Sequence, residues 1–575
     1  MSGLESQSVG PDALTGDVAA ASGPSRGRLA LASALVGVAT LILMLATEPM
    51  LAIVWDEGYT LGREARLRAW FGALRDPAGS AATWAPPAIE LVQQQGAPLP
   101  PPDRRDTLGE LLFDPEVLAW FWPFAREEPH GHPPFYALLG LTGDVLTPGR
   151  SDLQRGRLGP ILLFSITAGL LFRSVARRWG WWAAAASAGA WALHPHLFAH
   201  GHYASYDGPL TCLWLLTILA FVAGRESGRL AWAGAFGVAL GCAMADKLTG
   251  WFIPIPFLAW AAVYRDRRAL RFLVVGGLVG LATTYLLQPP WWTEPIAGPY
   301  RFFRSNLSRG ETIPIPVQFL GTIYNTPRES LPPYNTIVLT VFCTPVVFLA
   351  LGLAGAWRAV RRWKVEPILL LFLAHWAFLL LLRAMPRTPG HDGVRLFLPA
   401  FGVLALLAGP GAEQLRAWIG GASRWVVGLG LAEGAVAVAV MMPVPLSYYS
   451  PIVGGLPGAT RLGMEPTFYW DALDDGARAF LRENTPPGRT IRFATFPHSW
   501  IYLRDTGELP RAIAPIDPGV PLWYVVQNRP GALSAWDRAL LGRERTAYAV
   551  SKLGVPLVWV FRHEDLERAI REAAR

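Results

Sequence analysis

The chain has 575 residues, of which 52% are hydrophobic and only 16% are charged, and its mean hydropathy is +0.29. About a quarter of the residues of a soluble globular protein are charged, so this composition excludes a soluble enzyme and indicates a polytopic membrane protein. The net charge of +8 does not indicate a nucleic-acid partner, because the basic residues fall in short clusters between apolar runs, where the positive-inside rule expects them.

The apolar runs predict a membrane domain of many helices. About 20 apolar residues cross a hydrocarbon core of about 30 Å. Counted in this way, eleven candidate spans lie at 29–54, 157–176, 180–199, 206–223, 229–246, 249–264, 270–288, 335–356, 365–383, 394–410 and 424–441. We therefore expect an all-α transmembrane domain over 29–442, preceded by a disordered cytoplasmic tail at 1–28.

The basic residues predict the orientation of these spans. With eleven spans, six basic clusters fall on one side of the membrane, at 26–28, 173–178, 225–229, 265–271, 358–364 and 416–424. That side is the cytoplasmic one. We expect a multi-pass protein of the plasma (inner) membrane with its N-terminus inside and its C-terminus outside.

The segments expected outside the membrane differ in length and in composition. Two long outer loops are expected, at 55–155 and 288–335, and the first of them shows helical apolar spacing at 60–74 and 108–124, around a proline-rich stretch at 86–102. Aromatic amphipathic helices of this kind lie in the membrane interface. The composition changes beyond Met442, and residues 443–575 predict a small extracytoplasmic α/β domain with helices at 470–483 and 533–552 and strands at 490–496, 522–527 and 555–561.

Unusual polar residues collect at the outer ends of the expected spans. The sequence Trp-Asp-Glu-Gly-Tyr at 55–59 follows the first span, and adjacent carboxylates at a membrane boundary are costly to desolvate, which favours a functional role. Further acids, histidines and cations fall at the other outer turns, at His130, His132, His194, His196, His200, His202, Asp207, Asp246, Lys247, His391, Asp392 and Arg395. We expect this group to form one pocket.

Each of these residues has an ordinary structural explanation when it is taken alone. A histidine at the end of a span can be a polar cap, Asp207 before Gly-Pro is a good helix start, and Lys247 can extend to the lipid headgroups. Seven of the ten histidines lie on one face, however, and chance does not favour that distribution.

Carboxylates with a lysine and an arginine at an outer membrane surface suit transfer from a lipid-linked donor. Cations can hold a phosphate, which arginine binds through paired hydrogen bonds. A carboxylate can remove the proton of an acceptor hydroxyl. The density of histidines and acids is also compatible with a divalent metal, although no spacing requires one.

The order of the motifs resembles a known family. The motifs are WDEGY at 55–59, HPPFY at 132–136, YASYDGPL at 203–210, DKLTG at 246–250 and HDGVR at 391–395. Over about residues 29–440 this series is similar to the integral-membrane glycosyltransferases of fold type C. Among these it is most similar to the bacterial relatives of the protein O-mannosyltransferases and to the aminoarabinose transferases that modify lipid A.

The resemblance implies a function and a set of roles. The acid pair of the first loop carries catalysis in that family, which implies catalytic roles for Asp56 and Glu57. We expect the transfer of one sugar, with inversion, from a polyprenyl-phosphate donor to an extracytoplasmic acceptor (a protein hydroxyl, a lipid or a glycan), with no cofactor required. Asp56 is the expected base, Glu57 and Asp207 the ligands of sugar or acceptor, and Lys247 with Arg395 the phosphate clamp; the remaining expected substrate-binding residues are His130, His132, His202, His391 and Asp392.

The resemblance is not complete. The residue before the paired prolines is histidine in the mannosyltransferases and lysine in the aminoarabinose transferases, and it is His132 here, but the lysine that follows this motif in the mannosyltransferases has no match. Two other classes are alternatives: a transporter or lipid flippase, which predicts charges in the middle of spans and related halves of the sequence, and a scaffold with an outer binding domain, which leaves the polar cluster unexplained.

Overall fold

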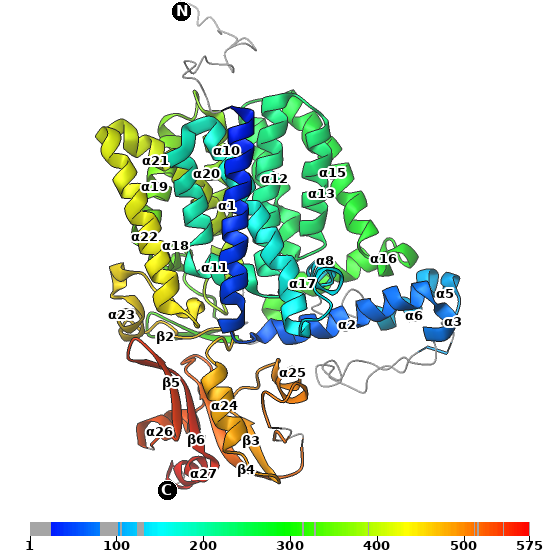
Figure 1. The fold of residues 1–575 in the computed structure, drawn as a ribbon, viewed down its shortest axis with the longest axis vertical. Helices are drawn as coiled ribbons and strands as arrows, with labels where there is room; N and C mark the ends of the chain where they lie inside the picture. Colours follow the sequence, from blue (N-terminus) through cyan, green and yellow to red (C-terminus); the bar gives the residue numbers. More distant parts are fainter. Residues whose placement is uncertain are drawn as a thin grey trace, which may run out of the picture.

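The structure is a computed structural model that describes residues 25–80, 102–103, 106–122, 132–312, 315–326, 329–388, 390–510, 512–514, 517–543 and 545–573. It consists of a helical bundle with a small domain of strands and helices at one end, which we call the domain end (Figure 1). The expected tail at 1–28 and the proline-rich stretch at 86–102 lie almost wholly outside the described residues.

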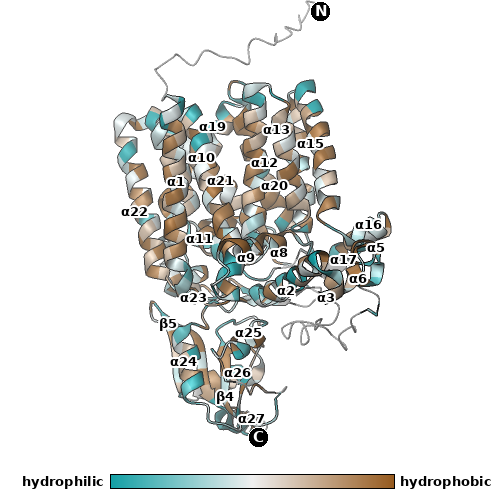
Figure 2. Ribbon diagram, turned by 45° about the vertical axis from the view of Figure 1, so that its right-hand side comes forward, coloured by the Kyte–Doolittle hydropathy of each residue, from teal (hydrophilic) through white to brown (hydrophobic). Residues whose placement is uncertain are grey.

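The bundle is formed by long helices rich in apolar residues. Among the described residues, six segments are long and apolar enough to cross a membrane, by length and composition, and the longest two, 152–192 and 395–441, each fold back once. Figure 2 shows apolar residues along the bundle and hydrophilic ones at its ends. The bundle helices are α1 (Arg26–Thr47), α10 (Asp152–Ala192), α12 (Asp207–Ser227), α13 (Ala231–Met244), α14 (Pro254–Val263), α15 (Arg267–Leu286), α19 (Val346–Arg361), α20 (Pro367–Ala384), α21 (Leu398–Ile419) and α22 (Ser423–Met441).

Glycines allow the bundle helices to approach closely. In α13 and α15, a Cβ added at Gly237 would lie 2.5 Å from the carbonyl oxygen of Gly276, and one at Gly241 would lie 2.5 Å from that of Gly280. Between α19 and α21, a Cβ at Gly411 would lie 1.8 Å from the Leu351 oxygen. Small residues at four-residue spacing are the usual contact of membrane helices, where dispersion contacts and not water exclusion stabilise the pair.

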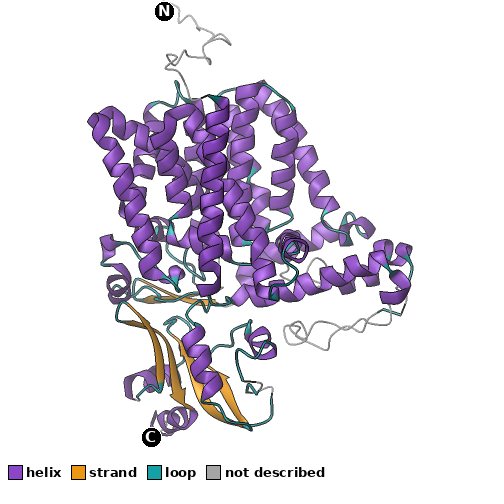
Figure 3. Cartoon of the chain, in the orientation of Figure 1, coloured by secondary structure: helices purple, strands orange, loops and turns teal. Residues whose placement is uncertain are grey.

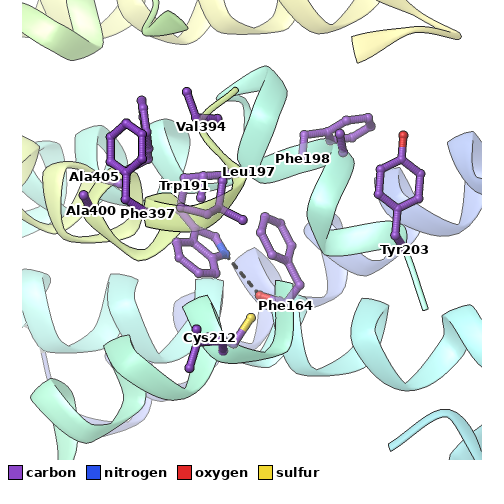
Figure 4. Close-up of a cluster of buried hydrophobic side chains, with 14 of the residues drawn as sticks. Phe164, Trp191, Leu197, Phe198, Tyr203, Cys212, Val394, Phe397, Ala400 and Ala405 are labelled. Carbon is purple, nitrogen blue, oxygen red and sulfur yellow. Dashed lines mark hydrogen bonds between the residues drawn. The ribbon is translucent and has the colours of Figure 1, made fainter. Parts of the chain in front are cut away.

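Large aromatic side chains fill the centre of the bundle. The rings of Phe164 and Trp191 stack with their centroids 4.7 Å apart, and the Trp191 indole N–H donates to the Phe164 carbonyl at 3.2 Å (Figure 4). Both residues belong to α10, which reverses direction at Gly180, where φ is +81°. Two predicted spans therefore pack against each other as two helices joined directly at Gly180.

Short elements cover the domain end of the bundle. The longest, α2 (Trp55–Arg75), runs sideways from the bundle towards α5 and α6 (Figure 1). The others are η2 (Glu48–Met50), α3 (Pro77–Ser80), α5 (Leu108–Phe113), α6 (Pro115–Phe121), α8 (Phe135–Gly140), α9 (Thr142–Leu146), α11 (Pro195–His202), η4 (Leu248–Phe252), α16 (Pro290–Thr293), α17 (Ala297–Thr312), β1 (Ile315–Phe319), β2 (Thr322–Thr326), α18 (Asn335–Cys343), η5 (Arg395–Phe397), η7 (Pro445–Ser447), η8 (Pro451–Val453) and α23 (Gly455–Arg461); η6 (Gly420–Ala422) joins α21 to α22.

Several predicted elements begin or break elsewhere than expected. The first span ends at Thr47, because Glu48-Pro49 starts a new turn, so the acids at 56 and 57 lie in the first turn of α2 and not at the end of the span. The helix expected at 108–124 is two helices, since Asp114 caps α6 before Pro115. The run at 335–356 is divided into α18 and α19 at Thr344-Pro345.

The C-terminal domain contains a four-stranded mixed sheet, which Figure 3 shows below the bundle. The strand order is β3-β4-β6-β5, with β3 parallel to β4 and the other pairs antiparallel. The elements are α24 (Asp475–Glu483), β3 (Arg489–Phe493), α25 (Trp500–Asp505), β4 (Val520–Gln527), α26 (Ala535–Arg543), β5 (Tyr548–Lys552), β6 (Val555–Arg562) and α27 (His563–Ala573).

One helix expected in this domain is wrong in its second half. The stretch at 533–552 is helical only to Arg543, and 548–552 is the strand β5. Leu553 and Gly554, both with positive φ, form a two-residue hairpin turn between β5 and β6. The glycine turn therefore overrides the helical spacing of the preceding residues.

Candidate active site

Asp56 is the point at which three parts of the chain meet. It lies in the first turn of α2, whose start is fixed by a hydrogen bond from the Trp55 N–H to the Tyr469 carbonyl at 2.9 Å. Its Oδ2 accepts hydrogen bonds from the phenols of Tyr206 and Tyr469 and from Nη1 of Arg395, the last at 2.6 Å. Residues far apart in the sequence thus fix one carboxylate oxygen.

The surroundings of Asp56 keep it ionised. Burial alone would raise the pKa of this carboxyl, but the Arg395 guanidinium and the hydrogen bonds from Tyr206 and Tyr469 outweigh burial and lower the pKa to about 2. Oδ1 takes no hydrogen bond from the described part of the chain, and the side chain retains 12% exposure. One carboxylate oxygen is therefore held by the protein and the other is open.

Acids and cations alternate around Asp56. Arg395 lies 3.6 Å from a carboxylate oxygen of Asp207 and 3.4 Å from one of Asp392, and the Lys247 ammonium lies 2.6 Å from Asp207. Asp207, Lys247 and Arg395 are buried and Asp392 is half-buried, so their charges are stabilised mainly by one another. The structure thus brings together four of the predicted residues, Asp207, Lys247, Asp392 and Arg395, beside Asp56.

The C-terminal domain supplies a further cation that the sequence analysis missed. Arg529 follows strand β4, and its Nη1 lies 3.1 Å from Asp392, while its Nε lies 3.5 Å from Glu465. Burial raises the pKa of Glu465 to about 7 despite the opposing charge of Arg529. Asp392 has φ +57° and precedes Gly393 with φ +63°, so Arg529 and Arg395 hold an acid in a tight left-handed turn.

The C-terminal domain also packs on the motif at 55–59. The His498 ring lies 4.0 Å from the Trp55 ring and 4.5 Å from the Tyr59 ring, centroid to centroid. Gly58 faces the same loop, and a Cβ there would lie 2.5 Å from the His498 carbonyl oxygen. The aromatic residues and the glycine of the motif therefore dock α2 on the C-terminal domain.

Glu57 has a different environment from its neighbour. Its two oxygens face Nε and Nη2 of Arg157 at 2.7 and 2.8 Å and also accept the backbone N–H groups of Val54 and Ala204. Arg157 in turn donates to the carbonyl groups of residues 48, 51 and 52. Glu57 is fully buried and saturated with donors, which differs from the sugar-binding role expected for it.

The predicted histidines divide into several environments. The His132 ring stacks on Tyr206 at 3.8 Å, and His391 is buried in the loop that carries Asp392. His202 instead joins α11 to α1, because its Nε2 lies 3.0 Å from the Met44 carbonyl oxygen. His130 lies outside the described residues.

A small cavity adjoins the acids and cations. It is lined by His196, His200, Asp392, Arg395, Leu446, Phe468 and Tyr469. Burial, followed by the charge of Arg395, holds the pKa of His200 well below its usual range, so this imidazole is neutral at physiological pH. A neutral imidazole can both donate and accept a hydrogen bond, as a sugar hydroxyl requires. Among the described residues, no group of three or more His, Cys, Asp and Glu side chains is arranged to hold a metal ion.

Sequence reasoning missed several residues of this centre: Arg157, Tyr206, Tyr469, His498, Arg529 and Glu465. Tyr206 lies within the motif at 203–210, but the sequence predicts a substrate-binding role only for its neighbour Asp207. Tyr469 and Trp470 both have positive φ, which the sequence does not reveal. Arg157, His498 and Arg529 carry no motif, and only the folded chain brings them to the site.

Comparison with known proteins finds one protein-family model that matches part of the chain and several solved structures that are similar to it. Residues 131–291 match the family model described as dolichyl-phosphate-mannose-protein mannosyltransferase, which confirms the resemblance seen in the motifs. No curated protein matches the chain by sequence. Among solved structures, ArnT from Cupriavidus metallidurans in the apo state is 15% identical, with a TM-score of 0.50, and the match covers 92% of this chain and 97% of that one.

Two other solved structures are less similar. The same ArnT bound to undecaprenyl phosphate gives a TM-score of 0.48 at 15% identity, with coverage of 92% and 97%. The archaeal oligosaccharyltransferase AglB from Archaeoglobus fulgidus, in complex with an inhibitory peptide and a dolichol-phosphate, gives 0.43 at 14% identity, with coverage of 87% of this chain and 69% of that one. The chain thus has the multi-span helical fold of ArnT with a small C-terminal mixed sheet.

Proposed function

We propose, from the match of residues 131–291 to the protein mannosyltransferase family and from the fold shared with ArnT, that this chain is a membrane glycosyltransferase. It would move one sugar from a polyprenyl-phosphate donor to the hydroxyl group of an extracytoplasmic acceptor. The observation that carries the proposal is the ionised Asp56, with one oxygen held by three donors and the other open; two of those donors, Arg395 and Tyr469, also line the small cavity.

The proposed reaction is a single displacement. The acceptor oxygen attacks the anomeric carbon, the bond between that carbon and the phosphate oxygen breaks, and prenyl phosphate leaves with the bonding electrons. The hydroxyl proton passes to Oδ1 of Asp56. Retention would need a second carboxylate as nucleophile about 5 Å away. Glu57 is held by Arg157 and two backbone N–H groups. Asp207 is paired with Lys247, and Asp392 with Arg529, so we favour inversion.

A carboxylate with so low a pKa is a weak base, and this fits the chemistry. Glycosyl transfer has an oxocarbenium-like transition state, in which positive charge develops on the sugar ring before the acceptor loses its proton. A fixed negative charge stabilises such a state without reorganising during the reaction. The neighbouring Tyr206 and Tyr469 keep that charge in place.

The proposed orientation places this reaction outside the cell. The arginines that are predicted to be cytoplasmic lie at the helix ends opposite to the domain end. Arg178, for example, lies near Gly180 and forms an ion pair with Glu226 at 2.6 Å. The positive-inside rule then assigns the domain end to the extracytoplasmic side. The lipid-linked donor and the acceptor would meet on that side, and no nucleotide-linked sugar would be needed.

The function is tested by turnover of defined donors. The purified chain is incubated with a panel of polyprenyl-phosphate sugars and a mixed cell-envelope acceptor fraction, and free polyprenyl phosphate is measured with and without a chelator. We expect release from at least one donor, dependent on the acceptor fraction. Absence of release from the whole panel by folded protein would reject the proposal, and the chelator arm decides the metal requirement.

We expect the pH profile of transfer to report the hydrogen bonds on Asp56. Since the pKa of this carboxyl is about 2, its protonation should not reduce kcat/KM between pH 4 and 7. Each phenol donates to the charged form and lowers the pKa, so Tyr206→Phe and Tyr469→Phe should raise it, and an acid limb should move towards the measured range. An unchanged profile in the double variant would show that Asp56 is not the group that titrates.

We expect the ion pair between Arg529 and Asp392 to support transfer. Arg529→Gln should lower kcat/KM on the order of tenfold, because one hydrogen bond between charged groups contributes about 1.5–3 kcal/mol and the turn at Asp392 also carries Arg395. Arg571→Gln, an exposed change in the same domain, is the matched control. Equal kcat/KM values for the two variants would show that Arg529 of the C-terminal domain does not contribute to the site.

A further inference from the structure

The cations of the candidate site have no spare charge for a phosphate. Lys247 is paired with Asp207, Arg529 with Asp392 and Glu465, and Arg395 with three carboxylates. An anion that bound to any of them would have to displace an acid already in place. Lys247 and Arg395, the expected phosphate clamp, are therefore already paired with acids. A phosphate group would bind more readily to a nearby cation that has no carboxylate partner.

Arg383 is such a cation. It lies in the last turn of α20, and only 3% of the residue is exposed. Its Nε and Nη2 are enclosed without a hydrogen-bond acceptor, and no carboxylate in the described part of the chain lies within ion-pair distance. Arg358, at the end of α19, differs in this respect because Glu366 lies 2.7 Å away.

The ordinary explanations of a cation at a helix end do not account for Arg383. A positive charge in the last turn interacts favourably with the helix dipole, but that interaction is small compared with the desolvation of an unpaired guanidinium. Arginines near the end of a span usually extend to the water interface, whereas this one is buried. A buried ionisable group in a membrane domain without a partner points to a ligand.

The position of Arg383 connects it with the candidate site. A Cβ built on Gly390 would lie 3.8 Å from its Nη2, so the guanidinium faces the start of the loop that holds Asp392 and Arg395. α20 also contacts η5, which begins at Arg395. Arg383 therefore lies behind the turn that carries the paired cations, at the same end of the bundle.

The chemistry of the unpaired edge of the Arg383 guanidinium indicates the class of ligand. Nε and Nη2 form one edge of the guanidinium, from which two parallel N–H groups can meet two oxygens of one anion. Phosphate oxygens fit this fork and leave a negative charge to balance the arginine. We propose that Arg383 binds the phosphate group of a phosphomonoester or phosphodiester at the domain end of α20.

Two sources could supply this group, a prenyl phosphate from the membrane or free inorganic phosphate. Only the first source rests on the function proposed above, because a polyprenyl-phosphate donor or product would carry the group. The test below measures binding in the absence of sugar and acceptor. Failure of binding therefore leaves the transferase proposal standing, and failure of transfer leaves the binding result standing.

Binding is measured on the purified full chain by thermal unfolding and by native mass spectrometry, with farnesyl phosphate, farnesol and inorganic phosphate as probes. We expect farnesyl phosphate to stabilise the wild-type chain and Arg383→Gln to weaken its binding on the order of 10- to 100-fold. Arg383→Lys should retain part of the affinity. Arg416→Gln, which removes an exposed arginine paired with Glu413, should bind as the wild type does. Displacement of farnesyl phosphate by inorganic phosphate would identify free phosphate as a source, and its failure would identify the lipid.

A second measurement separates binding from structure. Because the buried Arg383 guanidinium has no acid partner among the described residues, Arg383→Met should raise the unfolding temperature of the ligand-free protein and abolish the stabilisation by farnesyl phosphate. A lower unfolding temperature would show that Arg383 makes structural bonds, and would overturn the proposal. Equal farnesyl phosphate affinity in Arg383→Gln and the wild type would overturn it as well.

Discussion

Asp56→Asn should abolish sugar transfer while leaving the protein folded. The amide keeps the size of the side chain and can still accept the hydrogen bonds of Tyr206 and Tyr469, so the first turn of α2 should persist. It cannot accept the hydroxyl proton and carries no charge to stabilise the sugar cation. We expect kcat to fall by a factor on the order of 10³ or more.

The measurement compares release of polyprenyl phosphate by wild type and variant, after both have been shown to unfold at similar temperatures. Asp76→Asn, at the exposed other end of the same helix, is the matched control and should retain full activity. A variant at position 56 that kept even a tenth of the wild-type rate would transfer sugar without a carboxylate at this position, which the proposed mechanism does not allow.

The sequence predicted the residues of this site better than their arrangement. Asp56, Asp207, Lys247, Asp392 and Arg395 each stand beside a break in an apolar run, and opposite charges placed at one end of a bundle must pair there, since buried charges are costly alone. What the sequence could not show is how the pairs are distributed. Arg395 faces Asp56, Asp207 and Asp392 at once, and this depends on the angle at which η5 leaves the loop at 390–394.

The contribution of the C-terminal domain could not have been found from patterns. Arg529 and His498 come from loops with no periodicity, and they reach the site because β3 and β4 orient those loops towards the bundle. The start of α2 shows a related limit. Hydropathy extended the first span to Val54, whereas the backbone turns at Pro49 and leaves the acids in a new helix.

The pair at 56–57 illustrates why equal residues need not have equal roles. In the first turn of α2, consecutive side chains point about 100° apart around the helix axis. Asp56 consequently faces Arg395, and Glu57 faces Arg157 inside the bundle. Sequence alone gave both acids a catalytic role, but the structure gives the second a set of bonds that fixes the chain between α1 and α2.

Glu57→Gln should therefore act first on stability. The amide offers one acceptor oxygen where two were used, and it leaves the Arg157 guanidinium buried, at 1% exposure, without its main counter-charge. Removal of one member of a buried ion pair costs about 3–5 kcal/mol. We expect a fall of several degrees in the unfolding temperature in detergent, and a loss of activity that follows the loss of folded protein.

A double change distinguishes the ion pair from the size of the side chain. In a Glu48→Gln background, which removes the second acid that pairs with Arg157 at 3.1 Å, Glu57→Leu combined with Arg157→Met removes the remaining two charges together, so the double variant should be less destabilised than Glu57→Leu alone, because no uncompensated charge remains. Glu116→Gln, an exposed acid on α6 with no ion pair in the described part of the chain, should leave the unfolding temperature unchanged. If the double variant were as unstable as the sum of its two single changes, Arg157 would stabilise the turn mainly through the carbonyl groups of residues 48, 51 and 52, and Glu57 would be free for another role.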